Sequence, residues 1–352
     1  MEAPRMLVID EEPSDPRYGH SPSSRPVPDL LKYGLIPLDK PRGPSSHEVV
    51  AWVRKMLGVD RAGHSGTLDP PVSGLLPIGL GEATKALGLL LLFPKEYWAV
   101  MRLHSAVPRK QLDAVTGEFV GDIFQRPPQR SSVKRQVRTR KIYELEVVEA
   151  KGNLYLLRCL CEAGTYVRKL VYDVGEVLGV GATMVELRRT RVGPIQESEQ
   201  RFVTLHELSD AVYRLKSGDE SGLRGCVLPV ESIVTPFSRV VVRDSAVDAI
   251  CHGARLAVPG ILSVSENLAK DDTTVIVSAK GELVALGKSL MGASEIEKSK
   301  KGLAVTVERV ILEQETYPIM WKHQGSHGER PHAQAEAGPT KGSAAAAAGS
   351  PA

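Results

Sequence analysis

The chain has 352 residues, of which 42% are hydrophobic and 25% charged, and its formal net charge is +3 at pH 7. This size and balance are typical of a folded protein with more than one domain and exclude a chain that is disordered along most of its length. The weak positive charge permits a polyanionic partner without requiring one.

In the first half of the chain, hydrophobic periodicity predicts both helices and strands. Residues 1–28 are rich in Pro, Ser and Arg without a period, which predicts either an arm ordered by another surface or disorder. An amphipathic helix is expected over 46–57, with Ser46 as its cap, and a second one over 167–178. Alternation predicts a strand over 140–148, and the apolar run 154–161 predicts a central strand. Because strands and helices do not alternate strictly, we expect an α+β fold with a mixed sheet.

After about residue 236 the chain changes to short β-branched runs, which are typical of a small β-barrel. The expected strands are 240–242, 274–277, 283–286 and 304–311, with one short helix over 244–251. Lys280 and Gly281 predict a hairpin turn between two of these runs. From Gln324 onward the sequence is a low-complexity tail that we expect to be disordered.

The sequence carries no sign of export, of a membrane segment or of a metal site. The start lacks an apolar leader, and the longest apolar run, residues 87–93, is too short to span a bilayer. The four cysteines include no C-x-x-C pair, which argues against a zinc knuckle and a disulfide framework. We therefore expect a soluble intracellular protein with reduced thiols.

The strongest candidate site is the loop 63–74, where glycines and prolines surround a single carboxylate, Asp69. Such residues fix special backbone angles, so the loop would hold Asp69 in place against an apolar wall. The alternative is an ordinary turn in which Asp69 bonds its own backbone. A hydrolase triad of His64, Ser65 and Asp69 is disfavoured, because three members of one short loop rarely reach the required geometry. Metal-ligand spacing is absent as well.

Two basic features accompany this loop. Arg168 lies where the predicted buried strand leads into a helix, and its guanidinium would keep Asp69 ionised and oriented through an ion pair. The alternative is an arginine that faces water at the start of a helix. The segment 125–141 is basic and lacks Asp and Glu, which predicts phosphate contacts, although a solvated loop would look the same. Its candidate RNA-binding residues are Arg126, Arg130, Lys134, Arg135 and Arg138.

Several motifs in order give the chain, over about residues 26–322, a resemblance to a known family. The motifs are Leu38-Asp39-Lys40-Pro41-Arg42-Gly43, residues 63–74, Lys95-Glu96-Tyr97, Arg126-Pro127-Pro128, Val133-Lys134-Arg135, residues 164–170, Leu187-Arg188-Arg189 and Thr316-Tyr317-Pro318. They resemble the archaeal members of the dyskerin group of H/ACA-guided RNA pseudouridine synthases, which are relatives of the bacterial tRNA T-loop synthase. Pro71 and Ser132 are unusual for this group.

The resemblance implies an organisation into domains. It predicts an N-terminal arm over 1–28 that packs alongside the PUA domain, and a mixed-sheet catalytic domain over 29–236. A PUA domain, a small RNA-binding β-barrel, would follow over 237–315. A segment over 316–323 would then pack on the fold, before the tail 324–352.

The resemblance also implies the reaction, which is the conversion of uridine to pseudouridine in rRNA, or also in tRNA, under the direction of a guide RNA. Asp69 would be the nucleophile or electrostatic partner, oriented by Arg168, while Tyr97 stacks on the base and takes part in proton transfer. Tyr166 and Leu187 would line the pocket, and His64 would touch RNA beside it. Neither a metal nor an organic cofactor is needed.

The implied partners are an H/ACA guide RNA, a target RNA and small core proteins, including a kink-turn-binding protein. The compartment would be the cytoplasm of an archaeal-type cell, or the nucleolus in a eukaryote. Two alternatives stay open: a stand-alone tRNA pseudouridine synthase, and a non-catalytic RNA-binding scaffold.

Overall fold

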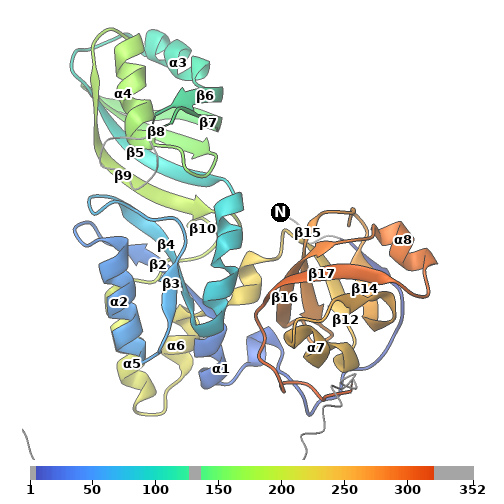
Figure 1. Cartoon of the computed structure of the whole chain (residues 1–352). Helices are drawn as coiled ribbons and strands as arrows, with labels where there is room; N and C mark the ends of the chain where they lie inside the picture. The colour runs from blue at the N-terminus through green and yellow to red at the C-terminus, as the bar shows by residue number, and fades with distance from the viewer. Residues whose placement is uncertain (1–4, 127–135, 321–352) are drawn as a thin grey trace, which may run out of the picture. The chain divides into compact units, whose positions relative to one another are not determined.

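The computed structural model describes residues 5–126 and 136–320, and these residues form two mixed sheets, one of ten strands and one of seven (Figure 1). Helices accompany both sheets, so the predicted α+β class is confirmed. The larger sheet runs, in order of pairing, through β11 (Leu228–Pro229), β2 (Gly34–Lys40), β4 (Ser73–Leu80), β9 (Ala182–Val192), β5 (Lys95–Leu103), β8 (Leu154–Cys161), β7 (Arg138–Lys151) and β6 (Gly121–Gln125). Two short strands lie off this path: β3 (Ala62–His64) pairs with β4, and β10 (Ile195–Gln196) pairs with β9.

The larger sheet is packed by two separate groups of helices. Near one end, α3 (Arg109–Glu118) and α4 (Val167–Val177) bury their apolar residues against β5, β7 and β8. Near the other end, α1 (Val27–Lys32), α2 (Ser46–Leu57), α5 (Leu205–Leu215) and α6 (Ser221–Cys226) pack against β2 and β4. A short parallel pairing of β4 with β9 joins the two ends, and the loop 65–72 leads into β4 at this joint.

Helix α2 shows how local sequence sets its limits. Its N-cap is Ser45, whose hydroxyl accepts a hydrogen bond from the Glu48 amide in a capping box, while Gly58 ends the helix in the left-handed region. The prediction that Ser46 is the cap was therefore wrong by one residue. Ser46 is instead the first helical residue, and its side chain is buried.

The seven-stranded sheet contains the β-branched runs that the sequence predicted. Its order is β1 (Met6–Val8), β14 (Ile261–Ser265), β12 (Ser238–Val242), β15 (Thr273–Ser278), β16 (Leu283–Ser289), β17 (Leu303–Val310) and β13 (Leu256–Ala257). Helices α7 (Asp244–Cys251) and α8 (Ala293–Lys298) and the 3-10 turn η4 (Val258–Gly260) complete this region. The predicted hairpin joins β15 to β16, and Gly281 adopts φ +88°, which favours glycine.

The N-terminal segment lies along the seven-stranded sheet. Strand β1 pairs antiparallel with β14, and further on the amide of His20 donates to the carboxylate of Glu282, at 2.9 Å. After the 3-10 turn η1 (Pro22–Ser24), the buried guanidinium of Arg25 donates to both carboxylate oxygens of Glu231, each at 2.8 Å. Sheet pairing and buried polar contacts therefore order the described part of this segment.

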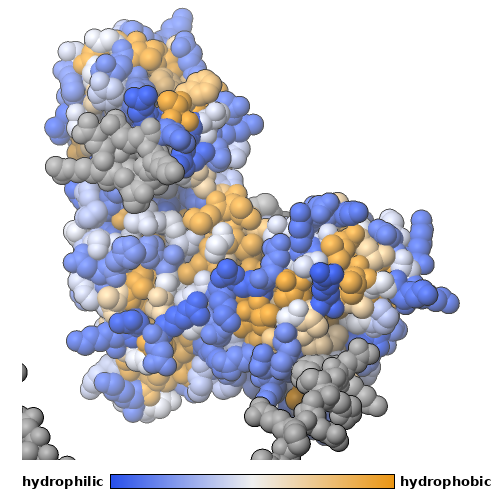
Figure 2. All heavy atoms as spheres, in the orientation of Figure 1, coloured by the Kyte–Doolittle hydropathy of each residue, from blue (hydrophilic) through white to orange (hydrophobic). Residues whose placement is uncertain are grey.

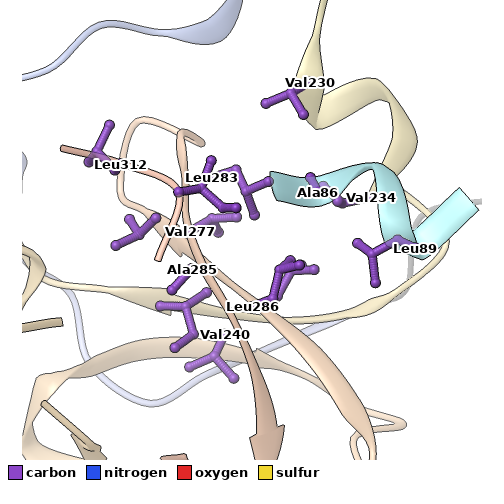
Figure 3. Packing of buried hydrophobic residues seen from close by; sticks show 14 of the residues in the cluster. Ala86, Leu89, Val230, Val234, Val240, Val277, Leu283, Ala285, Leu286 and Leu312 are labelled. Carbon is purple, nitrogen blue, oxygen red and sulfur yellow. The ribbon is translucent and has the colours of Figure 1, made fainter. Parts of the chain in front are cut away.

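One apolar cluster contains residues that come from both sheets. It joins η2 (Gly81–Leu92) and η3 (Val230–Ile233) to β12, β15 and β16, and Figure 3 shows Ala86, Val230 and Leu283 among the side chains that meet there. On the face in view in Figure 2, apolar residues gather over η2, where Leu91 and Leu92 remain exposed. The chain up to residue 320 forms one compact unit, so the predicted domain limits stay predictions. Among the described residues, no helix has the length and apolar character needed to cross a membrane.

Candidate active site

Five of the predicted residues meet at one cavity of about 300 Å³. They come from four elements: Asp69 from the loop before β4, Tyr97 from β5, Leu187 from β9, and Tyr166 and Arg168 from the start of α4. The strands β5 and β9 are paired neighbours, which places Tyr97 and Leu187 on adjoining strands. The topology thus brings together side chains that are far apart in the sequence.

Asp69 and Arg168 form the predicted ion pair, with 3.0 Å between Oδ2 of Asp69 and Nη2 of Arg168. The Asp69 side chain is 64% exposed and that of Arg168 is 59% exposed. The carboxylate therefore lies at the open side of the cavity, whose lining also includes the apolar side chains of Leu68 and Val72. This position leaves it accessible to a nucleotide that enters from solvent.

The loop that carries Asp69 is held by three buried side chains, Lys40, Ser46 and Arg189, which were not predicted to anchor it. The Nζ of Lys40 donates to the carbonyls of Pro41, Pro70 and Val72, at 2.9, 3.2 and 2.9 Å. Burial lowers the pKa of Lys40, and the nearby Asp69 charge opposes this shift. In the sequence, Lys40 is marked only as the charged end of strand β2, after the apolar residues 35–38 and Asp39.

Ser46 is the second anchor of the loop. Its hydroxyl accepts from the amide of Leu68 and donates to the carbonyl of Leu68, both at 2.9 Å. Leu68 directly precedes Asp69 and is buried. The start of α2 thus fixes the backbone beside the carboxylate.

A third anchor is Arg189, which is 1% exposed although its guanidinium borders the cavity. It donates from Nε to the carbonyl of Leu75 and from Nη2 to the carbonyl of Gly66, each at 2.8 Å. Gly66 has φ +69°, which favours glycine, and a Cβ there would make a tight contact of 3.0 Å with Nη1 of Arg189. Burial raises the pKa of Tyr97, which faces Arg189 across the two strands, and the Arg189 charge opposes that rise.

Two further bases near the cavity have lowered pKa values. Burial and then the Arg189 charge lower the pKa of Lys95 to about 8, and its Nζ donates to the carbonyls of Leu90, Leu91 and Phe93. Burial, followed by the charges of His47 and Arg189, lowers the pKa of His64 and favours the neutral ring.

His64 lies beside the cavity rather than in its lining. Its Nε2 is 3.3 Å from Oγ1 of Thr67, and its ring meets that of His47 edge-on at 5.0 Å between centroids. These contacts, rather than bonds to Ser65 or Asp69, are the ones that His64 makes in the described structure, so the geometry gives no support to a hydrolase triad. No group of three His, Cys, Asp or Glu side chains within residues 5–126 and 136–320 is placed to hold a metal ion.

The basic segment is only partly described. Arg126 is exposed just after β6, and Arg138 is the first residue of β7. Arg130, Lys134 and Arg135 lie outside the described residues. Arg126 and Arg138 therefore lie at the same end of the paired strands β6 and β7. This end is next to the start of α4, because the amide of Tyr166 bonds the side chain of Gln125.

Sequence models of four protein domains match the chain. They are a "DKCLD (NUC011) domain" over 2–50, a "TruB family pseudouridylate synthase (N terminal domain)" over 54–167, a "tRNA pseudouridylate synthase B C-terminal domain" over 168–235 and a "PUA domain" over 238–311.

Among curated relatives, a probable tRNA pseudouridine synthase B of Pyrobaculum arsenaticum is 49% identical, over 90% of this chain and 96% of the relative. A protein of the same name from Methanothermobacter thermautotrophicus is also 49% identical, over 90% of this chain and 97% of its own length.

Solved structures agree with these sequence matches. A chain of a Cbf5-Nop10-Gar1 complex is 47% identical with a TM-score of 0.83, covering 90% of this chain and 96% of that one. A chain of an H/ACA RNP bound to a substrate RNA containing 2′-deoxyuridine is 45% identical with a TM-score of 0.84, covering 90% and 98%. The chain therefore belongs to the TruB family of pseudouridine synthases, in its dyskerin-type branch.

Proposed function

We infer that the chain is the catalytic subunit of an H/ACA ribonucleoprotein and converts uridine to pseudouridine in rRNA at positions chosen by a guide RNA. The observation that carries this inference is the Asp69–Arg168 ion pair at a cavity of about 300 Å³ with Tyr97 in its lining. Support for the particle comes from the solved structures of similar chains in complex with Nop10, Gar1 and substrate RNA.

The reaction breaks the bond between N1 of uracil and C1′ of the ribose and forms a bond from C5 to C1′. The proton lost from C5 is balanced by one gained at N1, so no oxidant or reductant is consumed. A base inside a stack cannot turn over in this way, and the target nucleotide must first be flipped into the cavity. Asp69 supplies a negative oxygen that attacks either the base or the sugar, and both routes need the ionised carboxylate.

The remaining residues hold the base and the carboxylate in place. Arg168 orients Asp69 through the ion pair, and Tyr97 stacks on the base, a contact typically worth about 1 to 3 kcal/mol. Tyr166 and Leu187 line the cavity beside it. His64, whose ring meets that of His47 edge-on, contacts RNA next to the flipped nucleotide.

The RNA backbone meets the basic segment, in which Arg126, Arg130, Lys134, Arg135 and Arg138 neutralise phosphates and make binding dependent on salt. Residues 237–315 act as the PUA domain that holds the guide RNA, with the arm of residues 1–28 beside it. The catalytic domain spans 29–236, and the described part of the predicted segment 316–323, residues 316–320, packs on the fold through the buried Tyr317. A kink-turn-binding protein joins the other core proteins, and the particle acts in the cytoplasm of an archaeal-type cell.

The deciding experiment compares three substrates for the full-length chain: tRNA alone, a guide RNA with its target, and the same RNAs with the core proteins. Pseudouridine that forms in the target only when the guide is present supports the inference. Turnover of tRNA without guide would identify a stand-alone tRNA synthase instead. Binding of guide RNA without turnover under every condition would identify a scaffold.

Substitutions test the roles of the two charged residues. Asp69→Asn is expected to abolish product while RNA binding stays nearly unchanged, because the amide cannot attack and the fold loses no buried contact. Arg168→Lys should lower the rate, since an ammonium lacks the planar fork that orients a carboxylate. Normal product formation by Asp69→Asn would refute the assignment of this residue.

A further inference from the structure

The attraction between Asp69 and Arg168 is not enough by itself to fix the positions of their side chains. Both side chains are more than half exposed, and attraction between exposed charges is weak because water and salt screen it. Arg168 is the second residue of α4, so its position depends on how the start of that helix is fixed. The usual device is missing there, because the side chain of the N-cap residue, Tyr166, makes no capping hydrogen bond.

The backbone of Tyr166 is held from outside the helix by the side chain of Gln125. Oε1 of Gln125 accepts from the amide of Tyr166 at 2.9 Å, and its Nε2 donates to the carbonyl of Tyr166 at 3.2 Å. That carbonyl also accepts the first hydrogen bond of the helix, from the amide of Leu170 at 3.0 Å. Gln125 is 2% exposed and is the last residue of β6, so its side chain is shielded from solvent at the end of a paired strand.

We propose that Gln125 is a positioning residue for the reaction: its amide fixes the start of α4 so that Arg168 meets Asp69 and Tyr166 borders the cavity. This role rests on the proposed function of Asp69 and Arg168. It needs a side chain that donates and accepts at once, because the backbone of Tyr166 presents an amide and a carbonyl to it. A displacement of reacting groups by about 1 Å is enough to lower a rate by about 100-fold.

Two variants of nearly equal shape separate the hydrogen bonds from the packing. Gln125→Met fills the same space without donor or acceptor. Gln125→Glu is isosteric, and its neutral acid form reproduces the clamp, since the O–H donates to the Tyr166 carbonyl and the C=O accepts from the Tyr166 amide. Its carboxylate form cannot donate and repels that carbonyl. Burial favours the neutral acid, so the switch between the two forms falls at a pH above the usual range of a glutamate.

The test measures single-turnover pseudouridine formation in the assembled particle with guide and target RNA, from pH 5.5 to 8.5. Relative to the unsubstituted protein at each pH, Gln125→Met should be slower by about 10- to 100-fold throughout, with RNA affinity changed less than twofold. Gln125→Glu should be as slow at pH 8.5 and should recover most of the rate at pH 5.5. Gln111→Met and Gln111→Glu, at an exposed position on α3, are the matched controls and should stay at the unsubstituted rate.

A normal rate for Gln125→Met, or a Gln125→Glu rate whose ratio to the unsubstituted protein is flat with pH, would overturn the proposal. If Gln125→Met does not fold, the pH response of Gln125→Glu still decides, because it compares one protein with itself and can be reversed by a pH jump. Asp69→Asn is assayed in parallel. If Asp69→Asn is active, the proposed function fails; if it is inactive while the Gln125 variants are normal, only this inference fails.

Discussion

Two adjacent serines at the start of α2 allow helix stability to be separated from the position of the catalytic loop. Ser45 caps the helix, and Ser46 bonds the amide and the carbonyl of Leu68, next to Asp69. Ser46→Ala would leave both buried groups of Leu68 without this partner, at a cost of about 1 to 3 kcal/mol of folding free energy. Ser45→Ala would lose the cap, at a cost of about 1 kcal/mol.

The two variants should therefore be destabilised to a comparable degree but differ in activity. Because the freed loop shifts Asp69 relative to Arg168, Ser46→Ala should slow the single-turnover rate by about 10- to 100-fold. Ser45→Ala should stay within about twofold of the unsubstituted protein, because within the described residues its hydroxyl bonds Glu48 of its own helix. Urea unfolding gives the stability of each variant, and quenched-flow assays with excess particle over target RNA give the rate.

The reasoning would be refuted if Ser46→Ala lost stability and kept its rate, since the bonds to Leu68 would then not position the loop. It would also be refuted if Ser45→Ala were equally slow. That result would mean that the rate follows the stability of α2 rather than the geometry of the loop.

Two further predictions concern buried charges. Burial lowers the pKa of Lys95 to about 8. Between pH 8 and 10.5 the unfolded chain therefore binds more protons than the folded one, and the free energy of unfolding should rise by about 2 to 3 kcal/mol across this window. Urea unfolding at pH 7.5 and 10.5 should show this rise in the unsubstituted chain and lack it in Lys95→Met; equal slopes would contradict the assignment. Arg25→Met should lower the free energy of unfolding by about 3 to 5 kcal/mol, because it leaves the mostly buried carboxylate of Glu231 without its cationic partner. Adding Glu231→Gln should restore part of that loss, and a strictly additive double variant in urea unfolding would show that the pair is not coupled.

Local elements could be predicted from the sequence where one period dominated. The apolar run 154–161 coincides with β8, and the predicted helix 244–251 coincides with α7. The 3-10 segment η2 was not predicted, because its second half, residues 87–92, consists of leucines and one glycine and shows no usable period. Periodicity identifies a buried face by contrast with polar residues, so it fails where exposed positions such as Leu91 and Leu92 are apolar too.

The ion pair between Asp69 and Arg168 could be predicted because each residue lies in its own distinctive local motif. Lys40, Ser46 and Arg189 could not be found as anchors, since their partners are backbone carbonyls and amides of segments distant in the sequence. Any residue supplies such groups, so these contacts leave no mark in the sequence of the partner segment. The exposure of Asp69 could not be predicted either, because glycines and prolines indicate a fixed loop but not which side of it faces solvent.

Because Asp69 and Arg168 are both exposed, a bound substrate changes the strength of the attraction between their charges. Two unit charges 4 Å apart attract by about 1 kcal/mol in bulk water and by about 4 kcal/mol at an effective dielectric constant of 20. A uracil that enters the cavity displaces water from around Asp69 and Arg168 and so strengthens their attraction when chemistry begins. Added salt should consequently loosen the contact in the empty enzyme far more than in the occupied one. The attraction between Asp69 and Arg168 is thus strongest when the substrate occupies the cavity.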